Sequence, residues 1–110
     1  MEGQFRISNK IQNNKTKLPS RIGEQLKLAR EKKNFTIKEV ADSIHARTQY
    51  LECLEKGEYR NLPVDVYTQG FLKKYAEFLG LPSDEIVDFY KKEKSLYIIT
   101  IYEVLYKLLI

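Results

Sequence analysis

The chain has 110 residues, 43% of them hydrophobic and 31% charged, and this length and composition fit one small globular domain with tails. Glycine and proline are sparse and no stretch alternates apolar with polar residues, which excludes a β-rich fold and predicts an all-α one. One cysteine excludes a disulfide framework and indicates a reducing compartment, and the first 20 residues lack the apolar segment of a secretory signal.

The formal net charge is +4, but it is unevenly distributed along the chain. Residues 1–18 carry four basic side chains and one acidic one, whereas residues 19–94 carry 14 basic and 13 acidic side chains. The basic excess, which would otherwise suggest nucleic-acid binding, therefore lies mostly in the N-terminal tail. Because residues 1–19 are also polar, rich in Asn and Lys, and aperiodic, we expect them to form a disordered basic leader.

Helix signals begin at Ser20, which we expect to cap a first helix that runs through Lys33. Asn34 suits the left-handed residue that follows such a helix. Thr36 and Glu39 then form a capping box for a second helix. The apolar residues of this second helix recur at i, i+3, i+4 and i+7, at Ile37, Val40, Ala41 and Ile44.

A third helix is expected from Thr48 to Lys56, closed by Gly57. Only residues 45–47 separate it from the second helix, and two short helices joined in this way are typical of a helix-turn-helix unit. The sequence therefore predicts a helix-turn-helix domain over residues 20–94.

The fourth predicted helix begins after Pro63 and ends at Gly80. One apolar stripe, suited to the core, is formed by Leu72, Tyr75, Ala76 and Leu79. A second stripe beside it holds Tyr67, Phe71 and Phe78, with Lys74 among them. Because a small domain rarely buries both stripes alone, we expect either another helix or a partner protein to cover the aromatic one. We expect Gly70 to mark close approach of another helix.

A fifth helix is predicted from its Ser83 cap, and its apolar pattern fades over residues 91–94. Residues 95–110 then form an apolar tail interrupted by Glu103 and Lys107, and the tail is shorter than the ~20 residues of a membrane-spanning helix. Two alternatives remain for it. It forms a sixth helix packed on the domain or on a second copy, or it is a truncated membrane-proximal segment that lies at a membrane.

Residues 21–93 resemble the N-terminal cytoplasmic domain of the RodZ family of bacterial cell-shape proteins. The segments that carry the resemblance are Ile22-Gly23-Glu24-Gln25-Leu26 with residues 29–31, residues 50–52 with 54–57, and Leu62-Pro63 followed by Tyr67, Gly70-Phe71, Tyr75-Ala76 and residues 79–81. The resemblance implies a five-helix domain on the fold of Xre/Cro-like repressors. It also implies binding to the bacterial actin MreB, largely through the fourth helix, with aromatic contacts at Tyr67 and Phe71.

The RodZ family normally continues through a basic linker into a transmembrane helix and a periplasmic domain. Here the apolar tail follows Lys94 directly, so the chain is expected to be either a fragment or a shortened relative. The resemblance implies a location in the cytoplasm, at the inner face of the bacterial membrane.

The first functional hypothesis is a protein-binding adaptor. Tyr67, Phe71 and Phe78 would fill a groove on the partner, and each buried ring would contribute roughly 1.5–3 kcal/mol. Lys73 and Lys74 would pair with acidic groups around that groove. The alternative for these rings is that they pack inside the domain, under the fifth helix.

The second hypothesis is a DNA-binding regulator of the Xre/Cro type. In this fold the third helix enters the major groove, and the residues able to read bases there are Arg47, Thr48, Gln49 and Tyr50. Three acidic residues on or beside that helix, Glu52, Glu55 and Glu58, are expected to repel phosphates. This acidity favours the adaptor over the regulator.

An enzyme is the third hypothesis, and the sequence argues against it. The single histidine, His45, is expected in a turn, and the single cysteine, Cys53, is expected on the inner side of the third helix. Neither has a partner at metal-ligand or catalytic spacing. We therefore expect no catalytic residue, metal or cofactor.

Overall fold

The computed structural model describes residues 21–110, and no strand is present within them. Its elements are α2 (Arg21–Lys32), α3 (Ile37–Ile44), α4 (Thr48–Lys56), the short 3-10 helix η1 (Tyr59–Asn61), α5 (Asp65–Phe78) and α6 (Ser83–Leu109). This arrangement confirms the all-α fold of five helices with a helix-turn-helix unit. The expected leader at residues 1–19 and the Ser20 cap lie outside the described part of the chain.

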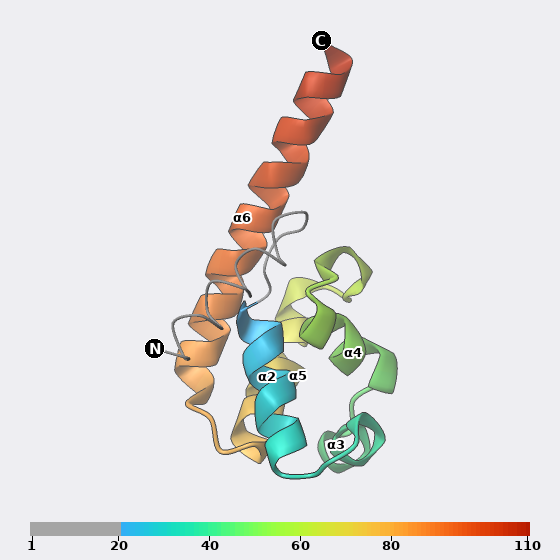
Figure 1. Ribbon diagram of the computed structural model, residues 1–110, viewed down its shortest axis with the longest axis vertical. Coiled ribbons are helices and arrows are strands. Elements are labelled where there is room, and N and C mark those ends of the chain that lie inside the picture. The colour runs from blue at the N-terminus through green and yellow to red at the C-terminus, as the bar shows by residue number, and fades with distance from the viewer. Residues whose placement is uncertain (1–20) are drawn as a thin grey trace, which may run out of the picture.

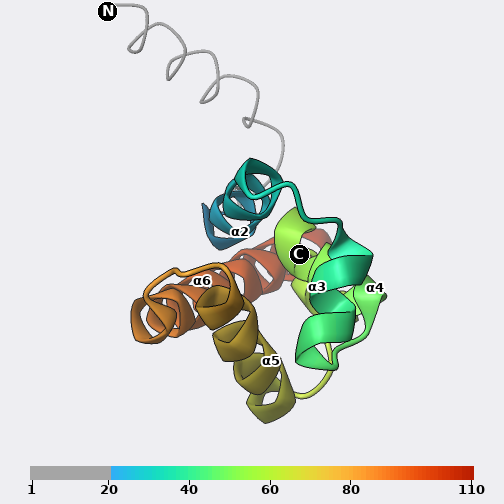
Figure 2. The same ribbon diagram turned by 90° about the horizontal axis from the view of Figure 1, so that it is seen from below.

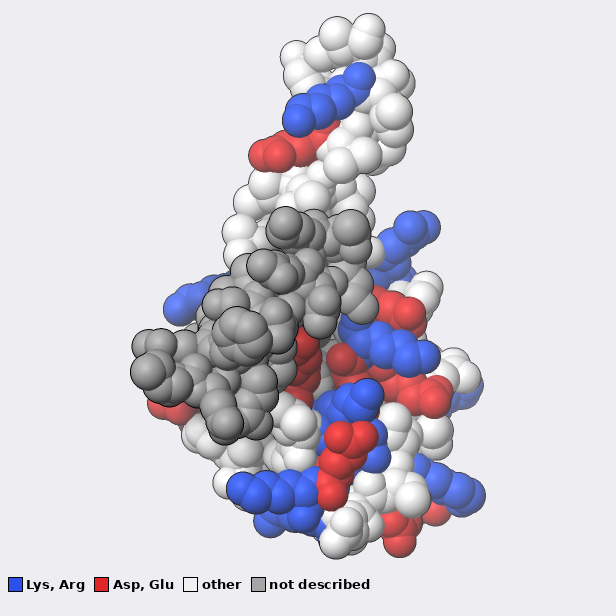
Figure 3. Space-filling model, viewed as in Figure 1, with Lys and Arg blue, Asp and Glu red and all other residues white. Residues whose placement is uncertain are grey.

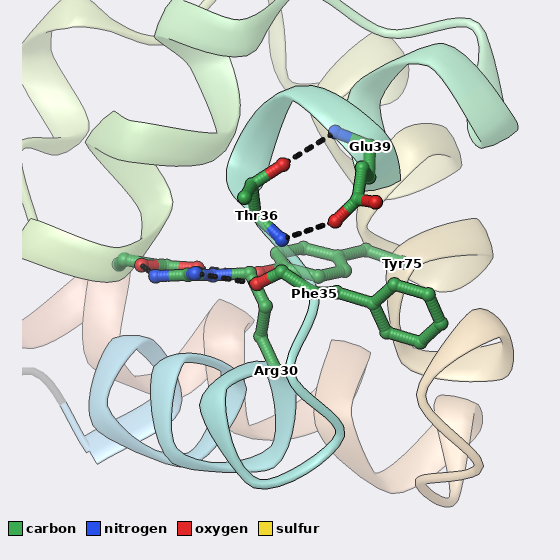
Figure 4. Close-up of polar contacts among 6 residues, drawn as sticks. Arg30, Phe35, Thr36, Glu39 and Tyr75 are labelled. Carbon is green, nitrogen blue, oxygen red and sulfur yellow. Dashed lines mark hydrogen bonds and ion pairs between the residues drawn. The ribbon is translucent and has the colours of Figure 1, made fainter.

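Most of the local end signals act as the sequence predicts. The exception is Ser83, which does not cap α6, because the N-cap position is Pro82 and no side-chain cap hydrogen bond forms there. The Thr36 side chain accepts a hydrogen bond from the Glu39 amide at 3.1 Å, and the Glu39 carboxylate accepts one from the Thr36 amide at 2.8 Å (Figure 4). These two bonds form the capping box that starts α3. Gly57 closes α4 with φ of 74°, and His45 takes φ of 58° in the turn between α3 and α4. Asn34 takes φ of 61° after α2, as expected.

The core lies where α5 meets the other helices, and α5 runs between α6 and the α3–α4 pair (Figures 1 and 2). Its buried apolar members are Ile22, Leu26, Val40, Ala41, Ile44, Leu51, Leu54, Tyr59, Phe71, Leu72, Tyr75, Ala76, Leu79, Ile86 and Tyr90. The predicted inner stripe of α5 is confirmed, because all four of its members are in this set. Each of the five α-helices contributes at least two of these side chains and η1 contributes Tyr59, so the core joins all the helices of the described chain.

A buried ion pair joins three of these helices. The Arg30 guanidinium of α2 donates to the Glu55 carboxylate of α4 at 2.7 and 3.0 Å, and to the Phe35 carbonyl at 2.9 Å (Figure 4). The Tyr75 hydroxyl of α5 donates to the same carboxylate. The bond to Glu55 raises the pKa of Arg30, and burial, followed by the bond to Glu55, raises the pKa of Tyr75. Arg30 therefore stays charged and Tyr75 stays protonated throughout the physiological pH range.

A second set of polar contacts fixes the middle of α6 to the domain. The Asp65 carboxylate, in the first turn of α5, accepts hydrogen bonds from the Tyr90 hydroxyl at 2.9 Å and from the Lys94 ammonium at 2.7 Å. The two oxygens of the Glu93 carboxylate accept hydrogen bonds from the Ile22 amide, at N···O distances of 3.1 and 3.2 Å. Glu93 thus supplies an anion and an acceptor at the start of α2, where amides lack partners within the helix.

Residues 95–110 do not form a separate sixth helix, because α6 is one helix of 27 residues that continues past Lys94. Residues 83–110 contain no glycine or proline, and Glu93 and Lys94 are anchored in helical positions by the domain itself. The helix therefore continues through the apolar tail. Figure 1 shows its C-terminal part projecting beyond the rest of the domain.

Replacing Glu55 tests the buried ion pair. The side chains of Arg30 and Glu55 are only 11% and 5% exposed, so Glu55→Gln leaves a buried cation without its counter-charge. We expect this variant to lower the free energy of unfolding by about 3 kcal/mol, measured by urea denaturation. Adding Arg30→Met should recover much of the loss, since it removes the unpaired charge.

The exposed ion pair between Lys38 and Asp42 provides the control. Lys38→Ala should change the free energy of unfolding by less than about 1 kcal/mol. A loss in Glu55→Gln no larger than the loss in Lys38→Ala would contradict the role given to the buried pair.

The Asp65 carboxylate makes the attachment of α6 sensitive to acid. The hydrogen bond from Lys94 lowers the pKa of Asp65 below its ordinary value. Its contribution to stability is therefore complete above the unfolded-state pKa of about 4, and it is lost as the pH falls through the folded value. We expect the difference in free energy of unfolding between the wild type and Asp65→Asn to be largest near neutral pH and to shrink below about pH 4.

Urea denaturation at several pH values measures this difference. Asp42→Asn is the control, because its carboxylate is exposed, lies outside the first turn of its helix and pairs with the exposed Lys38, so it contributes little. A difference for Asp65→Asn that does not change with pH would exclude the proposed linkage.

Candidate functional site

An aromatic cluster connects α4 with α5 at the surface. The Tyr50 and Phe71 rings are stacked, with centroids 5.8 Å apart and planes 13° from parallel. The Tyr67 ring makes edge-on contacts with both other rings, with its centroid 5.5 Å from that of Phe71 and 6.4 Å from that of Tyr50. Phe71 is 4% exposed and Tyr67 is 48% exposed. Tyr67 is therefore the exposed member of a cluster whose inner ring belongs to the core.

Of the two alternatives for the aromatic stripe, coverage by another helix is the one found for Phe71, which is 4% exposed. Tyr50 of α4 covers Phe71, and Phe35, in the loop between α2 and α3, contacts Phe78 with ring centroids 4.9 Å apart. The burial of Phe71 agrees with the alternative in which these rings pack inside the domain, and the ring contacts found there come from Tyr50 and Phe35. The period of α5 shows which residues share a face, but only the tertiary structure shows what lies against that face.

The remaining exposed part of this face is the α5 outer face, which we define as Val66, Tyr67, Gly70, Lys73 and Lys74. Lys73 lies 3.8 Å from Asp84, and both side chains are well exposed. Lys74 makes no ion pair with any described residue. The expectation for Gly70 is wrong for this chain, because a Cβ built there would meet nothing within 4 Å. Sequence reasoning also missed Val66, which is 84% exposed.

The predicted base-reading residues adjoin this face. Arg47, Thr48 and Gln49 are exposed, but Tyr50 is half-buried in the aromatic cluster, with the Arg47 guanidinium carbon 6.0 Å from its ring centroid. Three of the four predicted side chains are thus accessible at the start of α4. The candidate protein-binding and DNA-binding surfaces meet at Tyr50 and Tyr67, which come from different helices.

The three acidic residues expected to repel phosphates do not behave alike. Glu52 and Glu58 are exposed, as expected. Glu55 faces the interior, where Arg30 pairs with its charge. The inference that Glu55 repels DNA is therefore wrong, because a buried and paired carboxylate is not presented to a ligand.

The C-terminal part of α6 forms a second exposed apolar surface. The Tyr97 ring packs against the Tyr59 ring, with centroids 5.5 Å apart. Around and beyond Tyr97, α6 exposes large apolar side chains. Those in residues 95–110 are Leu96, Ile98, Ile99, Tyr102, Val104, Leu105, Tyr106, Leu108, Leu109 and Ile110. Figure 3 shows this projecting part as mostly uncharged, with one basic and one acidic side chain. Within residues 21–110, no helix combines the length and the apolar character needed to cross a membrane.

The two residues considered for catalysis lie in ordinary positions. His45 is exposed in the turn after α3. Cys53 is half-buried, and burial, together with the nearby Glu58 and Glu52 carboxylates, raises the pKa of its thiol. A raised pKa lowers the thiolate fraction at neutral pH, which makes Cys53 a poor nucleophile.

Comparison with known proteins identifies similar domains. The helix-turn-helix domain family matches residues 25–86. The cytoskeleton protein RodZ of Streptococcus pneumoniae is 35% identical over 69 residues, which are 63% of this chain and 25% of that protein. The uncharacterized membrane protein YmfM of Bacillus subtilis is 38% identical over 56 residues, 47% of this chain and 19% of that protein.

An uncharacterized protein of Haemophilus influenzae is 34% identical over 77 residues, which are 66% of this chain and 25% of that protein. No solved structure matches the chain. The chain therefore spans a quarter or less of the length of these curated relatives. Such a domain and its relatives point to a structural or regulatory protein.

Proposed function

We propose that this chain is a bacterial cell-shape adaptor. The premise is that it belongs to the helix-turn-helix domain family and carries a RodZ-like form of that domain. In this proposal α5 binds an actin-like cytoskeletal protein of the MreB type. The observation that carries the proposal is Tyr67, a large ring that is 48% exposed and held in place by Phe71 and Tyr50.

A ring held in this way suits an interface anchor. Most of the binding energy of an interface comes from a few residues, and tyrosine is enriched among them. Because Phe71 and Tyr50 fix the position of the Tyr67 ring, little side-chain entropy is lost on binding. One anchor of roughly 1.5–3 kcal/mol gives a weak contact, and many copies along a filament strengthen such contacts through effective concentration.

The five residues of α5 that were predicted to contact the partner have different roles in this proposal. Tyr67 is the direct anchor, and Lys73 and Lys74 face acidic groups of the partner from the next turns of the same helix. Phe71 is buried, and Phe78 is half-buried against Phe35. We therefore assign Phe71 and Phe78 the role of positioning the helix, and only Tyr67 the role of an aromatic contact.

We further propose that the C-terminal part of α6 associates with the inner face of the bacterial membrane. The exposed apolar side chains after Tyr97 need a nonpolar environment, and Lys91 and Lys92, both exposed, precede them. Lysines beside an apolar helical surface are attracted to anionic headgroups. One of the relatives is described as a membrane protein. The adaptor would then hold a cytoskeletal filament near the membrane from the cytoplasmic side.

DNA binding remains the second candidate, and one observation favours it. Arg47, Thr48 and Gln49 are exposed at the start of α4, where helix-turn-helix proteins contact bases. The burial of Glu55 also removes one of the three expected repulsive charges. Glu52 and Glu58 still face solvent beside this surface, so we place DNA binding second.

Tyr67→Ala tests the partner contact. Loss of one anchoring ring should weaken binding to purified MreB filaments by about 10-fold or more, measured by co-sedimentation of the full chain. Tyr102→Ala is the matched control, because it removes another exposed tyrosine at a distant site, on α6.

Circular dichroism should show that both variants stay folded. Equal filament binding by the wild type and Tyr67→Ala would rule out the proposed anchor. If the chain instead binds duplex DNA at low salt, and Arg47→Ala abolishes that binding, the second candidate replaces the first.

Leu105→Glu tests the membrane contact. A carboxylate on the apolar side of α6 should lower the fraction of the chain that floats with vesicles containing anionic lipid by about 10-fold or more. Thr100→Glu is the matched control, since it adds the same charge on the polar side that holds Glu103 and Lys107.

Equal flotation of both variants would contradict the membrane proposal. A wild-type chain that ignores vesicles but sediments as a dimer, and that becomes monomeric in Leu105→Glu, would instead make this helix a contact between two copies.

A further inference from the structure

Gly70 occupies a position that the domain itself does not explain. It lies in the interior of α5, is exposed, and has no heavy atom within 4 Å of where a Cβ would be. It is not among the residues with positive φ. A glycine in a helix interior is less stable than alanine, because it loses more backbone freedom on folding. Neither internal crowding nor backbone geometry therefore requires a glycine here.

The surroundings of Gly70 suggest an external requirement. On the helix surface its neighbours are Val66 and Tyr67 on one side, and Lys73 and Lys74 on the other, at spacings of three and four residues. Gly70 thus lies at the centre of the α5 outer face, between its apolar half and its basic half. A Cβ at this point would hold a partner farther from the α5 backbone.

A hollow beside Gly70 adds a second feature. It lies between α5 and α6 and has a volume of about 520 Å³. Gly70 and Lys73 line it from α5, and Val87, Asp84 and Asp88 are among the residues that line it from α6. Because Gly70 has no side chain, the hollow opens directly onto the centre of the α5 outer face.

We propose that a helix of the bound partner crosses α5 at Gly70 and places a side chain in the hollow between α5 and α6. The proposal rests on the proposed function and specifies how that partner is recognised. Packed helices lie 8–10 Å apart depending on the side chains at their contact, so a glycine at the crossing point permits the closest approach. The same absence of a side chain leaves room for a partner's side chain beside Val87.

The charges of the outer face define the partner helix further. Val66 and Tyr67 offer apolar surface on the N-terminal side of the crossing. On the C-terminal side, Lys74 has no ion-pair partner among the described residues, and the contact of Lys73 with Asp84 is long and exposed. The complementary surface is an amphipathic helix that is apolar at the crossing and acidic one turn away.

The test compares folding and filament binding in Gly70→Ala and Gly70→Leu. Gly70→Ala should raise the midpoint of urea unfolding, since its methyl group enters open space and alanine favours a helix. The same variant should weaken binding of the full chain to MreB filaments about 5-fold, and Gly70→Leu should weaken it further. A purely structural glycine would not produce these opposite effects on stability and binding.

Two further variants make the outcome decisive. Glu31→Ala, at an exposed position on α2, controls for the effect of added helix propensity and should leave filament binding unchanged. If Tyr67→Ala loses binding but both Gly70 variants retain it, the proposed function stands and the crossing at Gly70 is overturned. If the wild type does not bind filaments, or no α5 variant alters binding, both proposals are overturned.

Discussion

The ion pair between Arg30 and Glu55, with the Tyr75 hydroxyl bound to the same carboxylate, is the interaction on which the domain depends. It joins α2, α4 and α5, which are far apart in the sequence, at one buried point. Removing one charge from such a pair leaves the other without compensation, which destabilises a fold far more than loss of an exposed pair. Because Tyr75 lies on the inner stripe of α5, this network also sets the rotation of that helix, and so decides which residues it exposes.

The exposed face of α5 follows from that rotation. Phe71 turns towards α4 and stacks on Tyr50, which leaves Tyr67 at the surface beside Gly70 and the two lysines. The start of α4, where a helix-turn-helix protein would read DNA, lies against the same aromatic cluster. A partner seated on Tyr67 would therefore also approach Arg47. If the chain had both candidate activities, they would therefore compete for adjoining surface.

The α6 helix extends the domain away from this surface. Its first half is fixed to α5 and α2 through Asp65 and Glu93, whereas its second half exposes apolar side chains beyond the core. Since the helix is continuous, the orientation of its apolar end is fixed by contacts in its middle. The α5 outer face and the apolar end of α6 are therefore held in a defined relation, as the proposed adaptor requires.

The sequence by itself determined most of the helices and several of their ends, because caps, breakers and periodic apolar residues act over a few neighbours. The Thr36–Glu39 box, Gly57 and the inner stripe of α5 were all predicted. It also indicated the candidate face on α5 and its resemblance to RodZ. Only the tertiary structure decided that Phe71 is covered, that Glu55 is paired with Arg30, that nothing in the domain approaches Gly70, and that the last helix continues past Lys94. The physical reason is that burial and charge compensation depend on which distant segment packs against a residue, and the local pattern carries no record of that neighbour.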